Sequence, residues 1–183
     1  NPLLGPAAPA ELLSLWRDIR NRLIGRLSAM SPKDRLTWYG PNMSAISFAS
    51  ARLMETWAHS QDVFDTLEIK RVNRAGLRHV AHMGVATFGW SFILRKLKAP
   101  DIKPRIALTG PAGEKWVWGE PHATERVWGS AEEFCLVVAQ RRNVADTALQ
   151  WQGEHVAKWL TIAQAFAGVP QNPPAPGIRV IEY

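Results

Sequence analysis

Side chains with the types and spacing of a metal or substrate site lie in the stretch ARLMETWAHSQDVFDTL. Glu55 and His59 stand four residues apart, and Asp62 follows three residues later. Side chains at i and i+4 of a helix project from one face about one turn apart. The carboxylate and the imidazole could therefore converge on one divalent transition metal. Asp62 could orient His59 or act as a weak ligand, and Arg52, one turn earlier, could neutralise Glu55.

The spacing by itself leaves two interpretations open. A Glu–His pair at i, i+4 is common on solvated helix faces, where it contributes only about a few tenths of a kcal/mol. A catalytic zinc site normally uses three protein ligands. His79 and His82 are candidates for the third, although their apolar surroundings in LRHVAHMGV favour ordinary core or surface histidines. Spacing alone therefore favours a solvated helix face over a metal site.

Two amphipathic helices are expected in the first part of the chain. In AELLSLWRDIRNRLIGRLSAM, apolar residues recur at i, i+3, i+4 and i+7 with the arginines on the other side, which predicts a helix over residues 10–29. The segment SPKDRLTWYGPNMS interrupts this pattern with prolines and a glycine. Ser44 can then cap a second helix over residues 44–67, the helix that carries the Glu–His pair.

The next segment, NRAGLRHVAHMGVATFGWSFILRKL, is apolar and has the length of a helix over residues 73–97. Gly84 and Gly89 are points where a neighbouring element could approach closely. The Pro-flanked APDIKPR then marks a boundary near residues 99–104.

Beyond this boundary, short alternating runs replace the helical period. RIALTGPAGEKWVWGE predicts a hairpin with Trp116 and Trp118 on one strand face. TERVWGS predicts another strand, and AEEFCLVVAQRR and AKWLTIAQAFAG predict helices, the second ended by a glycine. We therefore predict a helical part over residues 1–99, a small α+β module over 100–168 and a Pro-rich extended tail over 169–183.

Composition and motifs narrow the classes of function. The net charge of +6 invites a nucleic-acid partner, but the densest basic clusters, LRKLK and QRRN, are too short for a stripe that follows phosphates. The sequence therefore predicts no nucleic-acid partner. HExxH, GxSxG, P-loop and GxGxxG patterns are absent, which argues against the common hydrolase and nucleotide-binding classes. No apolar run is long enough to predict a membrane span, and no signal peptide is recognisable.

Cys135 is the single cysteine, so an internal disulfide is excluded. It lies in the apolar run EEFCLVVAQ, which favours a buried, inert thiol over a reactive one. This cysteine usage fits a reducing, cytoplasmic setting.

The segments MSAISFASARLMETWAHSQDVFDTL and LRHVAHMGVATFGWSF resemble the metal-binding proteins related to mycothiol-dependent maleylpyruvate isomerase, within the DinB-like superfamily. The specific pattern is R-x-x-E-x-W-A-H-x-x-D, matched here by Arg52, Glu55, Trp57, Ala58, His59 and Asp62. RVWGSAEEFCLVVAQRRNVADTALQWQG resembles that family's C-terminal module, which is similar to sterol carrier proteins. The resemblance spans most of residues 10–168 and points to an uncharacterised branch of the family.

This resemblance implies a mainly α protein: a partial DinB-like up-down helical bundle in residues 1–99, with a divalent metal at one end, followed by the α+β module. Glu55 and His59 match two of the family's metal ligands; zinc is the expected metal, with nickel and iron as alternatives. The third ligand, a histidine of an early helix, has no counterpart in this chain. Because the chain opens NPLLGPAAPAELL without Met, we expect that histidine upstream of Asn1, and a complementary N-terminal fragment or a second copy would complete the bundle.

The leading functional hypothesis is a metal-assisted isomerase or transferase that depends on a low-molecular-weight thiol such as mycothiol. The metal would lower the pKa of the bound thiol, which then adds to an electrophilic small molecule. Arg52 would bind a substrate carboxylate and Asp62 would tune the metal. The alternative is a non-catalytic module that binds a hydrophobic ligand or protein partner through its Trp-rich C-terminal part.

Overall fold

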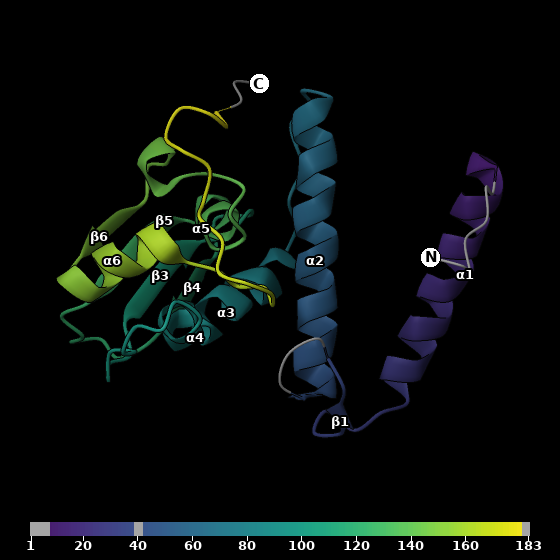
Figure 1. Ribbon diagram of the computed structural model, residues 1–183, viewed down its shortest axis with the longest axis horizontal. Coiled ribbons are helices and arrows are strands. Elements are labelled where there is room, and N and C mark those ends of the chain that lie inside the picture. The colour runs from purple at the N-terminus through teal and green to yellow at the C-terminus, as the bar shows by residue number, and fades with distance from the viewer. Residues whose placement is uncertain (1–7, 39–41, 181–183) are drawn as a thin grey trace. The chain divides into compact units, whose positions relative to one another are not determined.

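The structure is a computed structural model, and it describes residues 8–38 and 42–180 (Figure 1). The chain forms two compact units, residues 1–49 and residues 50–183. These packing units do not coincide with the predicted boundary near residue 99. The domain ranges inferred from the sequence, 1–99, 100–168 and 169–183, stay a prediction.

In the first unit, helix α1 (Pro9–Ser28) confirms the helix expected over residues 10–29. Proline occupies its first turn, where the missing N–H costs nothing. The Glu11 carboxylate accepts a hydrogen bond from the Ala8 N–H at 3.2 Å, which satisfies one of the free donors at this helix end. The helix ends at Ser28, and the N–H of the C-cap residue Ala29 donates to the Arg26 carbonyl.

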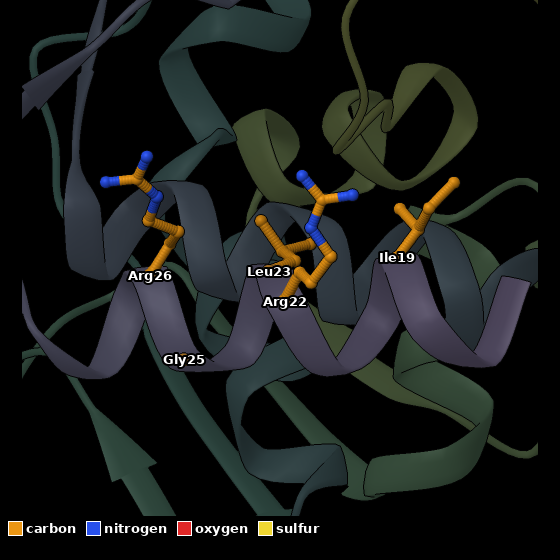
Figure 2. Close-up of a pocket in the computed structure, with 5 residues that line it drawn as sticks. All are labelled: Ile19, Arg22, Leu23, Gly25 and Arg26. Carbon is orange, nitrogen blue, oxygen red and sulfur yellow. The ribbon is translucent and has the colours of Figure 1, made fainter. Parts of the chain in front are cut away.

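A shallow pocket lies along α1, and Figure 2 shows Ile19, Arg22, Leu23 and Arg26 projecting from the same side of the helix. This side mixes aliphatic and guanidinium groups. The arginines were expected opposite the apolar stripe. That expectation is wrong for Arg22 and Arg26, because positions i, i+3, i+4 and i+7 share one face.

Helix α2 (Ala45–Thr66) confirms the second helix and starts where Ser44 predicted. The Ser44 hydroxyl accepts a hydrogen bond from the Ser47 N–H at 3.2 Å, which is the expected N-cap. Just before it, strands β1 (Arg35–Leu36) and β2 (Met43–Ser44) form a two-residue antiparallel ladder. This ladder was not predicted, because the connection that contains it carries mainly turn residues.

The apolar segment 73–97 is not one helix. Helix α3 (Leu77–Ala86) and helix α4 (Phe88–Ile93) are separated at Thr87. The Thr87 hydroxyl donates to the carbonyls of Met83 at 2.8 Å and Gly84 at 3.0 Å, and this back-bonding competes with the helical pattern. A continuous apolar period does not reveal such a break.

The second unit continues with a four-stranded sheet in the order β4-β3-β5-β6. The strands are β3 (Arg105–Thr109), β4 (Lys115–Trp118), β5 (Arg126–Ser130) and β6 (Gln150–Gln152). The pair β3–β5 is parallel and the other two pairs are antiparallel. The predicted hairpin and the strand in TERVWGS are confirmed, whereas β6 was missed because it has only three residues.

Helices α5 (Ala131–Val138) and α6 (Glu154–Ile162) pack on one face of this sheet, and a short 3₁₀ helix, η1 (Val144–Asp146), lies between them in the sequence. The side chains of Ile106, Leu108 and Val127 project from this face of the sheet and are fully buried. Helix α6 ends at Ile162, so the expected continuation to Gly168 is wrong. Every helix within the described residues is too short or too polar to span a membrane.

The core of this unit is aromatic and tightly packed. The rings of Phe88 and Trp159 meet edge to face at 5.1 Å between centroids, and Phe134 meets Trp159 at 5.8 Å. Helix α3 reaches α5 at Gly84, where an added Cβ would lie 2.7 Å from a methyl carbon of Val138. Gly84 is therefore a point of close packing, as its sequence context suggested.

We predict that Gly84→Ala lowers the free energy of unfolding by about 2 kcal/mol, because the added methyl overpacks the contact with α5. Urea denaturation should show a lower midpoint with an unchanged slope. Gly89→Ala is the matched control, since its Cβ would meet only Ala99 at 3.7 Å, an ordinary contact. Equal midpoints for the two variants would contradict the proposed close packing.

Candidate functional site

Helix α2 presents two different stripes over its length in the second unit. Met54, Trp57 and Ala58 belong to the buried core. The other stripe carries Arg52, Glu55, His59 and Asp62, which recur at helical spacing, and Arg52 and His59 are exposed. The four candidate residues thus share one side of the helix, as their spacing predicted.

Glu55 and His59 lie close enough to hold one ion. The Glu55 Oε2 and His59 Nε2 atoms are 3.5 Å apart. Two ligands of a tetrahedral zinc ion with bonds of about 2.0–2.2 Å stand roughly 3.3–3.5 Å from each other. The His59 side chain is 71% exposed, so its ring is accessible. The donor types and their separation therefore fit two positions of a divalent-metal site.

Asp62 is held by arginines. The Arg141 guanidinium binds both oxygens of the Asp62 carboxylate, with Nε 2.9 Å from Oδ1 and Nη2 2.9 Å from Oδ2. Arg179 also forms an ion pair with Oδ1. The Asp62 Oδ2 atom is 3.6 Å from His59 Nδ1, which is too long for a hydrogen bond. Asp62 thus faces the imidazole as a charge while its strong bonds go to the arginines.

One turn further, Asp65 forms a buried ion pair with Arg142. The Arg142 guanidinium donates to both oxygens, at 2.8 and 2.9 Å, and the two side chains are only 8% and 7% exposed. Gln61 donates to Oδ1 at 2.8 Å and Arg179 to Oδ2 at 3.0 Å. Such a pair is stable away from water only because its oxygens are fully hydrogen-bonded.

These contacts shift the ionisation of both acids. Burial raises the pKa of Asp65, but hydrogen bonds from Arg142 and Gln61 and the Arg142 charge outweigh it, so the pKa falls from 3.8 to about 2. Burial also raises the pKa of Asp62, while hydrogen bonds from Arg179 and Arg141 lower it further than burial raises it. Both carboxylates are therefore ionised at neutral pH.

The arginines reach α2 because of local structure that the sequence did not reveal. After α5, Gln140 adopts a positive φ of 55° and reverses the chain. The N–H groups of Arg141 and Arg142 then cap the Leu136 carbonyl. Arg179 comes from the C-terminal tail, for which only an extended course was predicted. In the sequence, only the basic string QRR indicates this cluster of ion pairs, and it does not show which carboxylates the arginines bind.

The remaining candidates do not join the Glu–His pair. His79, His82, His122 and His155 are exposed, and within residues 8–38 and 42–180 no group of three or more His, Cys, Asp or Glu side chains could hold a metal. Cys135 is fully buried, as predicted. Burial raises the pKa of its thiol well above the usual value, so it is not a nucleophile at neutral pH.

Comparison with known proteins connects this helix to a family. Residues 3–64 match the mycothiol maleylpyruvate isomerase N-terminal domain. The match confirms the resemblance inferred from the R-x-x-E-x-W-A-H-x-x-D pattern. The segment shared with this family contains Arg52, Glu55, His59 and Asp62, whereas the arginines that hold Asp62 and Asp65 lie outside it.

The chain is also 48% identical over 167 residues to uncharacterized proteins from two strains of Mycobacterium tuberculosis, CDC 1551/Oshkosh and ATCC 25618/H37Rv. Each alignment covers 91% of this chain and 65% of the relative, so the chain spans just under two thirds of their length. No solved structure matches the chain.

The acid stability of the protein should depend on Asp65. Because its pKa is lower in the folded than in the unfolded chain, the ionised carboxylate stabilises the fold above about pH 4 by roughly 2 kcal/mol, and this contribution is lost as the pH falls toward 2. Asp65→Asn should therefore lower stability at pH 7 and flatten its decline between pH 4 and 2. Urea denaturation across this range measures the effect.

Asp101→Asn provides the control, because Asp101 is an exposed carboxylate outside this network. It should leave both the stability at pH 7 and the acid profile close to those of the unaltered chain. An Asp65→Asn profile as steep as that of Asp101→Asn would contradict the role given to the buried pair.

Proposed function

We propose that the protein binds a divalent metal through Glu55 and His59, and that it is an isomerase or transferase acting with a low-molecular-weight thiol. Zinc is the proposed metal, with nickel and iron as alternatives. The observation that carries the proposal is the 3.5 Å separation of Glu55 Oε2 and His59 Nε2 on the accessible stripe of α2. Its support is that this stripe lies within the match to the mycothiol maleylpyruvate isomerase N-terminal domain.

A bound divalent metal supplies Lewis acidity, which lowers the pKa of a coordinated thiol and favours the nucleophilic thiolate at neutral pH. The proposed thiol comes from outside the chain. The only cysteine of the chain, Cys135, is buried and the pKa of its thiol is raised, so it does not provide a reactive thiolate. The proposed substrate is an electrophilic small molecule that accepts the thiolate.

Residues next to the pair have separate roles in this proposal. Arg52 is exposed on the same stripe, one turn before Glu55, and its guanidinium binds a carboxylate of the substrate. The ionised Asp62 carboxylate, 3.6 Å from His59 Nδ1, favours the Nδ1–H tautomer electrostatically and so leaves Nε2 as the metal-binding nitrogen. Arg141 and Arg179 keep that carboxylate charged.

Two protein ligands are one fewer than a catalytic zinc site usually has. We propose that a histidine from a complementary segment or from a second copy supplies the third. In this view α1 and α2 are helices of a DinB-like bundle, and the residues after 100 form a module similar to sterol carrier proteins.

The proposal is tested by the metal content of the purified full chain. His59→Ala should abolish bound zinc, and Glu55→Gln should weaken it, because each variant removes one of the two donors. Elemental analysis after dialysis against a weak chelator measures retention. Cobalt substitution adds a second readout, since the visible absorption of bound Co²⁺ reports the nitrogen and oxygen donors directly.

His122→Ala is the matched control, because it removes an exposed histidine from the loop after β4. This variant should keep the metal content and the cobalt spectrum of the unaltered chain. Stoichiometric zinc in His59→Ala, or equal loss in His122→Ala, would overturn the assignment.

A further inference from the structure

The sheet of the second unit has an outer face, opposite the one that α5 and α6 cover. Directly paired residues of neighbouring strands point to the same side of a sheet. The pairs Ala107↔Val117, Ala107↔Trp128 and Trp128↔Gln150 therefore form one row across all four strands. Val117 is 45% and Trp128 38% exposed, so this row is accessible to a partner.

Three cations flank this row on the same face. Arg105 and Arg126 pair across β3 and β5 on one side of it, and Lys115 pairs with Thr109 across β4 and β3 on the other. None of the three forms an ion pair with a carboxylate among the described residues. No strand residue of this face is Asp or Glu. The strand residues of the face are Arg105, Ala107, Thr109, Lys115, Val117, Arg126, Trp128, Ser130, Gln150 and Gln152.

The indole of Trp128 is held in place at the centre of the face. Its Nε1–H donates to the Gln150 side-chain oxygen at 3.1 Å, so the polar edge of the ring is already satisfied. What remains available is the π surface of the ring. Arg126 lies two residues away on the same strand, about 7 Å along it. A rigid aromatic surface thus adjoins positive charge.

We propose that this outer face binds single-stranded nucleic acid, with one base stacked on Trp128 and phosphates held by Arg105, Arg126 and Lys115. Aromatic stacking combined with a positive surface is the general way in which proteins hold single strands without sequence preference. The Thr109 hydroxyl accepts a hydrogen bond from Lys115 Nζ at 2.7 Å and can still donate one to a base or sugar. Gln152 places an amide group on the same face.

The charge of the face decides between occupants. A second copy of the chain cannot pair with it face to face, because that would bring cations together without a carboxylate between them. A membrane surface is less suited, because the two exposed apolar side chains, Val117 and Trp128, lie on strands of a sheet rather than on a projecting loop or helix face. A strand of phosphates fits both the charge and the aromatic ring.

This proposal departs from the prediction, made from the sequence, of no nucleic-acid partner. That prediction considered basic clusters along the chain, whereas the cations of this face are ten or more residues apart in the sequence and belong to three strands. The proposal is independent of the metal site on α2, so either one can fail alone.

Fluorescence anisotropy of a short fluorescein-labelled oligothymidylate, and of an oligouridylate of equal length, tests binding by the full chain. The logarithm of affinity should fall with the logarithm of salt concentration with a slope of about −2, as expected for three phosphate contacts to a single strand. Trp128→Leu should weaken binding about tenfold. The double variant Arg105→Gln/Arg126→Gln should make the slope shallower, with a magnitude below about 1, because it removes two of the three phosphate contacts.

Trp151→Leu is the matched control for the ring, because Trp151 is 41% exposed but pairs with the buried Val127 on the opposite face. Lys158→Gln, an exposed cation on α6, is the control for charge. Circular dichroism checks that each variant is folded. Absence of oligonucleotide binding at physiological salt, equal losses in Trp128→Leu and Trp151→Leu, or binding only to phosphatidylglycerol vesicles would overturn the proposal.

Discussion

The buried ion pair between Asp65 and Arg142 is the constraint on which the arrangement of residues 50–180 depends. Two charges that leave water lose several kcal/mol of hydration each, and they recover it only with close geometry and saturated hydrogen bonds. Asp65 meets this condition through Arg142, Gln61 and Arg179. The ion pair therefore fixes the positions of three segments relative to one another: the last turns of α2, the turn after α5 and the C-terminal tail.

This network also determines the character of the candidate metal site. Asp62 belongs to both, because Arg141 and Arg179 bind its carboxylate while His59 lies beside it. Its charge is fixed by residues far along the chain, whereas Glu55 and His59 remain accessible. Helix α2 thus carries a buried, structural carboxylate at Asp65 and, on its accessible stripe, the Glu55 and His59 side chains whose separation suits two ligands of one metal ion.

The sheet shows the same division between a structural and an accessible side. Its inner face is apolar and supports the aromatic cluster of Phe88, Phe134 and Trp159. Its outer face collects positive charge around Trp128. Alternation along short strands produces both surfaces from the same segments, because successive side chains point to opposite sides. Trp116 and Trp159 are buried in the core, whereas Trp128 is exposed on the outer face.

The sequence by itself determined the features that depend on local periodicity and local spacing. The bounds of α1 and α2, the Ser44 cap, the hairpin, the buried thiol of Cys135 and the shared stripe of Glu55 and His59 all follow from neighbours within about one or two helical turns. The motif on α2 also led to the family that the comparison confirmed for residues 3–64. The break at Thr87 and the early end of α6 escaped because hydrogen bonds and packing override a continuous apolar pattern there.

Only the tertiary structure decided which distant residues meet. No local pattern predicted that the Asp62 carboxylate bonds to Arg141 and Arg179, which lie 79 and 117 positions away. Cations that look dispersed along the chain share one sheet face, because strand pairing joins residues 105, 115 and 126. Charges act through space, so their partners depend on the fold rather than on their order in the chain.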